Sequence, residues 1–307
     1  MINLIAISGT GRTGSTLLSV ILSQNKQCFN VGQIRDFWKA YLLNAPCTCA
    51  VSLQDCEKWA KIVELAFGPA PEQDLKNMHQ MTQSFMAYAR AHHQWSDQAT
   101  RALARQKHQA LLLSLNRFFN AVQHVTGTDY LLDASKSPEI AYLFSLVPDT
   151  HLSVINLVRD PRAVCSSWNK KLGRDFALNQ SVEWGVRQIL LRQWSTLLGN
   201  RFVQVRYEDF TTSPRFVMEQ LSFWAFGDGH LNAFTSDDAV DVSWTAQHLY
   251  PPANERFIAE RKDHIVISEA TEWRKEKDLA LHAHVNEKLA KLLPQYGYVL
   301  SPIFEKA

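Results

Sequence analysis

The residues with the clearest chemical potential form a glycine-rich run near the amino terminus. Gly9–Thr16 reads GTGRTGST and matches the phosphate-binding pattern G-x-x-x-x-G-K-[ST] everywhere except at Ser15, which takes the place of the lysine. Glycines let the backbone wind around an anion, and the amides that begin a following helix point at it. We therefore predict that this run binds a phosphate-like group. The alternative is a glycine turn without a ligand.

The missing lysine restricts which anion the loop is suited to bind. In nucleotide-hydrolysing proteins that lysine neutralises the β- and γ-phosphates during phosphoryl transfer. Here Arg12 places a planar charge inside the loop instead, and such a charge suits a single terminal oxyanion group. The sequence therefore favours a nucleotide carrying one phosphate and one sulfate over a triphosphate that needs Mg²⁺.

A second candidate anion site follows the apolar run Leu152–Val158. Arg159 comes directly after this run, where open α/β sheets bind ligands, and Ser166 and Ser167 lie about two turns into the next helix. Arg159 and one of these serines could hold a second phosphate, some distance from the first loop. Alternatively, Arg159 and Asp160 form an ion pair that caps the helix.

Strand-like and helix-like segments alternate along the chain. The predicted buried strands are Ile2–Ile7, Tyr130–Asp133, Leu152–Val158 and Phe202–Arg206. The predicted helices are Ser15–Ser23, Pro138–Leu146, Pro161–Lys170 and Pro214–Trp224, and three of them begin at a proline. This alternation predicts an α/β fold with a P-loop-type parallel sheet flanked by helices.

The stretch at residues 57–125 contains no strand pattern. Leu111, Leu115, Phe118 and Val122 fall on one helical face there, so we expect a helical insertion after the first strand–helix unit. A closing amphipathic helix is expected at Glu276–Leu293. Because the chain shows no linker or internal repeat, a single domain covering residues 1–307 is predicted.

Composition and charge exclude several classes of protein. A net charge of +2 over 307 residues is too small for a nucleic-acid binder. No stretch approaches the roughly 20 apolar residues of a membrane-spanning helix, and no leader pattern precedes the first strand, so a cytoplasmic location is expected.

The five cysteines do not form the framework of a secreted protein. Cys47, Cys49 and Cys56 could suggest zinc, but they lack a second paired ligand set and a nearby histidine. Reduced thiols are therefore favoured, and no metal site is predicted.

Taken together, these motifs resemble those of the sulfotransferases that use 3′-phosphoadenosine 5′-phosphosulfate (PAPS), especially the carbohydrate and tyrosylprotein branches. Gly11–Leu18 is similar to that family's 5′-phosphosulfate loop, and Val158–Val164 with Ser167 is similar to its 3′-phosphate motif. The other similar parts are Asp133–Pro138, the cysteine-containing stretch Asn44–Trp59, His248, Arg256, Trp273 and Tyr296–Tyr298.

The resemblance implies transfer of a sulfuryl group from PAPS, with PAP as product, to a hydroxyl or amine. The acceptor would be a small molecule, a lipid-like alcohol or a carbohydrate. The implied cofactor-binding residues are Arg12, Thr13, Gly14, Ser15, Thr16, Arg159, Ser167 and Arg256. Such an enzyme would reject ATP, because ATP would leave the 3′-phosphate site at Arg159 unpaired.

The catalytic base of the family has no direct counterpart. Many members carry glutamate after the glycine of a V-G-E segment, whereas this chain carries Gln33. An amide cannot accept a proton at useful pH, so Gln33 can orient the acceptor but not deprotonate it. His248 is the leading alternative because imidazole titrates near neutrality, and Asp36 is the second. An acceptor that is already nucleophilic would need neither.

Arg12 and Lys136 are the candidates for stabilising charge on the leaving oxygen during in-line transfer. With these cations and the backbone amides, the reaction requires no metal. Two alternatives stay open. A P-loop kinase is disfavoured by the absent lysine and because Asp133 is the sole plausible acidic residue for Mg²⁺. A nucleotide-binding protein with weakened or lost catalysis is supported by Gln33.

Overall fold

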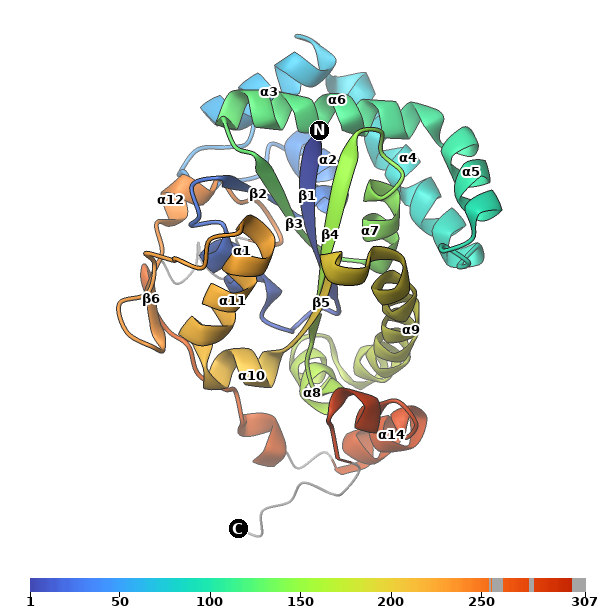
Figure 1. Cartoon of the computed structure of the whole chain (residues 1–307), viewed down its shortest axis with the longest axis vertical. Coiled ribbons are helices and arrows are strands. Elements are labelled where there is room, and N and C mark those ends of the chain that lie inside the picture. The colour runs from blue at the N-terminus through green and yellow to red at the C-terminus, as the bar shows by residue number, and fades with distance from the viewer. Residues whose placement is uncertain (254, 256–261, 276–278, 300–307) are drawn as a thin grey trace.

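A five-stranded parallel sheet forms the centre of the computed structural model, which describes residues 1–253, 255, 262–275 and 279–299 (Figure 1). Its strands are β1 (Ile2–Gly9), β2 (Cys28–Gly32), β3 (Tyr130–Lys136), β4 (Thr150–Val158) and β5 (Phe202–Arg206). They lie in the order β2-β3-β1-β4-β5. The predicted α/β fold with a parallel sheet between helices is confirmed, since apolar clusters cover both faces of these strands.

Alternate residues of β1 face the two sides of the sheet. Leu4 and Ala6 belong to an apolar cluster with α2 (Ile34–Leu42), α6 (Gln109–Thr126) and α7 (Pro138–Phe144). Ile5 and Ile7 belong to a second cluster with α1 (Ser15–Leu22) and α11 (Pro214–Phe226). This period of two explains why β1 reads as an unbroken apolar run, because neither face meets water.

The second strand and the helix after it were missed by the sequence analysis. Strand β2 is short and contains Asn30 and Gly32, so it lacks the apolar run that predicts a buried strand. The fold satisfies Asn30 locally. Its amide Nδ2 donates to Ser19 Oγ at 3.2 Å, and its Oδ1 accepts the Gly32 N–H at 2.9 Å. A buried polar residue is tolerated within a strand when it is hydrogen-bonded in this way.

Four helices occupy the stretch where no strand was predicted: α3 (Glu57–Phe67), α4 (Glu72–Ala91), α5 (Gln98–Lys107) and α6. They lie together at one end and one side of the sheet (Figure 1). They follow β2 and α2, so two strand–helix units precede them in the chain. The assignment of residues 1–307 to a single domain stays a prediction.

Three of the remaining helices agree with the proline pattern. α7, α8 (Pro161–Leu172) and α11 each begin at the expected proline. Within the described residues, the other α-helices are α9 (Arg174–Leu198), α10 (Tyr207–Thr212), α12 (Trp244–Gln247) and α14 (Leu279–Leu289). A small hairpin pairs β6 (Ala239–Asp241) with β7 (His264–Val266). Residues 276–278 of the predicted closing helix lie outside the described residues. In the described part of the chain, no helix is both long and apolar enough to cross a membrane.

Strand order determines where a ligand can bind. The chain adds β2 and β3 on one side of β1, and β4 and β5 on the other. Neighbouring strands β1 and β4 are thus the point at which the connections reverse direction, and open α/β sheets bind ligands beyond the carboxyl ends of such strands. The paired residues Gly9 and Leu157 place the ends of these two strands level with one another.

Phe37 provides a test of the core between α2 and the inserted helices. Its ring lies 4.7 Å from the ring of Trp59 and 5.2 Å from those of Phe118 and Tyr250, and it is fully buried. Phe37→Ala should lower the free energy of unfolding in urea by about 3–5 kcal/mol, because a cavity replaces these contacts. Phe216, which is exposed on α11, is the matched control, and Phe216→Ala should change stability by at most about 0.5 kcal/mol. Equal effects of the two substitutions would contradict this packing.

Candidate functional site

The glycine-rich run forms a tight loop between β1 and α1. Gly9 has φ 132° and Gly14 has φ 82°, backbone conformations that favour glycine. A Cβ atom at Gly9 would lie 2.4 Å from the Leu157 carbonyl oxygen, so no side chain fits there. Gly14 is the residue before α1, and α1 has no side-chain cap. The first N–H groups of α1 therefore depend on another partner, which an anion in the loop would supply.

The two predicted anion motifs lie side by side. The expectation that some distance separates them is wrong, because β4 is the direct neighbour of β1. Arg159 Nη1 donates to the Arg12 carbonyl oxygen at 2.8 Å, and Arg12 Nε donates to Ser167 Oγ at 2.8 Å. Of the two candidate serines, Ser167 thus faces the loop. Ser166 lies instead 3.0 Å from His282 Nε2.

Arg159 has the environment of an anion-binding residue. Only 9% of it is exposed, its guanidinium lies 4.1 Å from the centre of the Tyr207 ring, and its Nε has no hydrogen-bond partner among the described residues. The alternative ion pair with Asp160 is wrong, since Asp160 pairs with Arg162 at 2.6 Å and caps α8 through the Arg162 N–H. A buried cation without a counter-charge is costly, so an anion at Arg159 would stabilise it.

Lys136 lies beside the loop at the end of β3. It is paired across the sheet with Ser8, the residue before the loop, and it has φ 60°. Burial, together with the positive charges of Arg35 and Arg187, lowers the pKa of Lys136 to about 8. Its positive charge at neutral pH is therefore held in an unfavourable environment, which a bound anion would relieve.

Arg187, a half-buried residue of α9, connects the loop to Lys136. Its Nη1 donates to the carbonyl oxygens of Gly9, at 3.1 Å, and Lys136, at 2.8 Å. The sequence analysis missed Arg187, because a single arginine within a long helix carries no pattern that distinguishes it. Tyr207 was missed as well. A Cβ atom at Gly14 would lie 3.1 Å from its ring, so Tyr207 packs against both the loop and Arg159.

Gln33 is buried at the amino end of α2, next to the same edge of the sheet. Gly32 pairs with Asp133 of β3, three residues before Lys136. The Asp133 carboxylate accepts hydrogen bonds from Ile34 N and from the backbone and side chain of Ser135, each at 2.9 Å. Burial raises the pKa of Asp133 to about 6 despite these bonds. They give Asp133 a structural role in holding the start of α2.

His248 lies in a different environment from the one expected of a base. Its Nδ1 is 3.3 Å from Cys56 Sγ, and its carbonyl oxygen accepts the Trp59 Nε1–H at 2.7 Å. Among the described residues, its hydrogen-bond partners do not include Gln33 or the phosphate loop. Asp36 forms an ion pair with Arg35 at 3.1 Å. Arg256 lies outside the described residues, so its predicted contact with the nucleotide stays a prediction.

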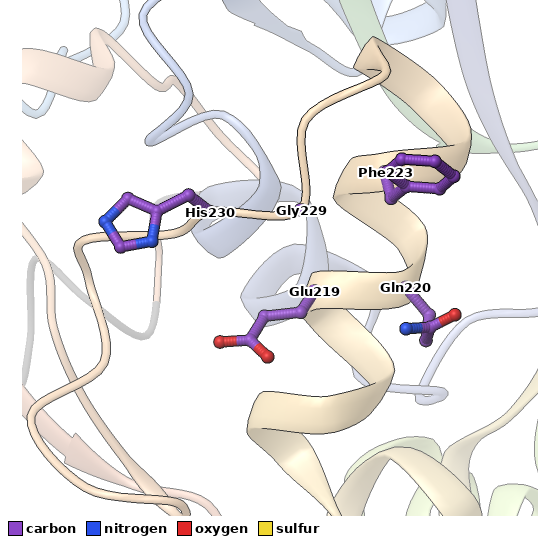
Figure 2. A pocket seen from close by; sticks show the side chains of 5 residues that line it. All are labelled: Glu219, Gln220, Phe223, Gly229 and His230. Atoms are coloured by element: carbon purple, nitrogen blue, oxygen red, sulfur yellow. The ribbon is translucent and has the colours of Figure 1, made fainter.

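A surface pocket lies away from these motifs in the sequence. Figure 2 shows its lining of Glu219, Gln220, Phe223, Gly229 and His230, from α11 and the segment after it, around a cavity of about 330 Å³. None of these residues belongs to the phosphate loop or to the strand ends that flank it. The pocket is therefore separate from the candidate phosphate site.

Comparison with known proteins agrees with this arrangement. The profile of the Sulfotransferase family matches residues 5–225, which include both anion motifs. No curated protein matches the chain in sequence. Among solved structures, the sulfotransferase domain of the Synechococcus PCC 7002 olefin synthase is 20% identical with a TM-score of 0.54, over 98% of this chain and 95% of that one.

The sulfotransferase domain from the curacin biosynthetic pathway gives a similar result. It is 17% identical with a TM-score of 0.52, over 98% of this chain and 99% of that one. At these identities the structural likeness concerns the fold, whereas the family profile covers more than half of the chain. Both strand-end motifs lie within the matched residues. The chain therefore belongs to the sulfotransferase family.

Proposed function

We propose that this protein transfers a sulfuryl group from PAPS to a hydroxyl or amine of a small-molecule, lipid-like or carbohydrate acceptor. The observation that carries the proposal is Arg159. Among the described residues, the Nε of its buried guanidinium has no hydrogen-bond partner. Its Nη1 is hydrogen-bonded to the backbone of a glycine-rich loop that lacks the lysine required for a triphosphate. A nucleotide with separate 3′ and 5′ anionic groups fits two adjacent anion sites of this kind.

The residues present fit such a nucleotide. The loop backbone and side chains from Arg12 to Thr16 would hold the 5′-phosphosulfate, at the start of α1. Arg159 and Ser167 would hold the 3′-phosphate, and the bond from Arg12 to Ser167 couples the two sites. In the same proposal Arg256 closes over the nucleotide.

The chain's own cations would provide electrostatic stabilisation during transfer. PAPS, when bound, supplies an activated sulfuryl group on its 5′-phosphate. Lys136 places a positive charge beside the loop, and Arg187 fixes the backbone of both Lys136 and Gly9. Preorganised charges of this kind stabilise developing negative charge without rearranging. We therefore propose that the transfer step requires no metal.

The acceptor would lie near the start of α2. Gln33 is buried there and, as an amide, orients the acceptor rather than deprotonating it. We propose Asp36, one turn further along α2, as the base in place of His248, because His248 Nδ1 lies against Cys56. If catalysis has been lost because of Gln33, the cofactor site would still bind PAP. Adding an acceptor would then not convert PAPS to PAP.

Nucleotide selectivity provides one test of this proposal. PAP at about 100 times its dissociation constant should add about 2.7 kcal/mol to the stability of the protein, whereas ADP and ATP with Mg²⁺ should add little. The reason is that only PAP carries the 3′-phosphate for Arg159. Thermal unfolding with and without each nucleotide measures this shift.

Two variants control this measurement. Arg159→Ala should abolish the PAP-induced shift, each variant being compared with its own ligand-free midpoint. Arg117→Ala, an exposed arginine of the inserted helix α6, should leave the shift unchanged. Stabilisation by ATP with Mg²⁺ but not by PAP would overturn the proposal and favour a kinase.

A second prediction concerns pH. Because the pKa of Lys136 is lowered to about 8 in the free protein, Lys136 loses its charge as pH rises above 8, whereas the phosphates of PAP are already ionised. A bound anion raises this pKa, so the dissociation constant of PAP should increase by up to about tenfold per pH unit above 8.

Lys136→Arg provides the matched control, because a guanidinium stays charged throughout this range. Calorimetric titrations between pH 7 and 9.5 should show a flat dissociation constant for this variant and a rising one for the natural protein. The same slope in both proteins would show that Lys136 does not contact the nucleotide.

A further inference from the structure

Three cysteines and one histidine come together in a cluster outside the phosphate site. Its members are Cys47, Cys49, Cys56 and His248. One potential ligand atom from each lies within 4.8 Å of all the others. Cys56 Sγ lies 3.3 Å from His248 Nδ1. In the sequence these cysteines lack a second paired ligand set and a nearby histidine, so no metal site was predicted. The fold supplies a histidine from 192 residues away.

The spacing of these atoms suits a tetrahedral metal ion. Zinc binds cysteine sulfur at about 2.3 Å and histidine nitrogen at about 2.0–2.1 Å, so its ligand atoms lie roughly 3.5–3.8 Å from one another. The cluster is within about an ångström of that arrangement. Three thiolates and one imidazole also form a donor set typical of structural zinc sites.

Backbone hydrogen bonds hold both parts of the cluster in place. Cys47 N donates to the Val51 carbonyl oxygen at 2.8 Å, which closes the loop that carries Cys47 and Cys49. Thr48 and Leu249 bond to each other twice: Thr48 N to Leu249 O, and Leu249 N to Thr48 Oγ1, each at 2.9 Å. These two hydrogen bonds join the segment that carries Cys47 and Cys49 directly to the segment that carries His248. The backbone therefore holds the candidate ligands near one another.

We propose that Cys47, Cys49, Cys56 and His248 bind one zinc ion in a closed structural site. Four protein ligands fill a tetrahedral zinc, so no position is left for water or substrate. Each cysteine binds as its thiolate, so its proton is released to solvent, and the imidazole binds in its neutral form. The ion is neither oxidised nor reduced, and the proposal is independent of PAPS.

The position of the cluster indicates what the zinc would stabilise. Tyr250, two residues after His248, donates its hydroxyl to the Val31 carbonyl oxygen at 2.6 Å. Its ring packs so closely on Gly32 that a Cβ atom there would lie 2.9 Å away. The ion would therefore fix the segment that supports the backbone just before Gln33, while taking no part in the transfer itself.

Metal content is the direct test. The full chain should be purified without chelators and passed through a desalting column. Elemental mass spectrometry should then find one zinc ion per protein molecule. Cys56→Ser and His248→Ala should lose most of it. Cys165→Ala is the matched control, because Cys165 is also buried but lies outside the cluster, and it should keep its zinc.

Two further measurements keep the test decisive if the first variants fold poorly. His248→Cys preserves four ligands and should retain zinc, which a merely structural role of the imidazole would not explain. Cobalt(II) added to the zinc-free natural protein should give the intense absorption bands of tetrahedral thiolate coordination. Zinc-free protein with three free thiols, or with a disulfide between two of these cysteines, would overturn the proposal.

Discussion

The parallel pairing of β1 with β4 is the constraint on which the candidate site depends. It brings the end of β1 level with the end of β4, and Gly9 meets Leu157 so closely that only glycine fits there. The phosphate loop and Arg159 consequently emerge next to each other. The two motifs are in direct contact through the Arg12 carbonyl oxygen, and the proposed nucleotide with two anionic groups depends on this contact. The selectivity proposed for this protein therefore originates in strand order.

The two arginines that follow β4 are both buried, and their different partners give them different roles. Arg162 is neutralised by Asp160 and donates to Asn286 and to the Val299 carbonyl oxygen, so it ties α8 to α14 and to the segment that contains Val299. Arg159 has the aromatic face of Tyr207 but no acidic partner among the described residues. Its unsatisfied charge is a cost to the free protein that an anionic ligand would offset. In such a site, the preference for an anionic ligand is already set by the folded, ligand-free protein.

The side of the site formed by α2 depends on contacts between distant parts of the chain. Tyr250 packs against Gly32, while Trp59 donates to the carbonyl oxygen of His248. These contacts connect the start of α2, the inserted helices and the segment after α12. Substitutions in the loop that carries Cys47 and Cys49 would consequently affect the position of Gln33.

The sequence by itself determined the α/β class, four of the five central strands, the proline-initiated helices and both anion motifs. Each of these depends on local patterns, namely apolar runs, glycine conformation and the restricted φ of proline. Only the tertiary structure decided that the two motifs touch, that Ser167 and not Ser166 faces the loop, and that Arg187 and Tyr207 complete the site. It also decided that His248 joins three cysteines. These features arise from strand order and long-range packing, and residues far apart in the sequence carry no local sign that they will meet.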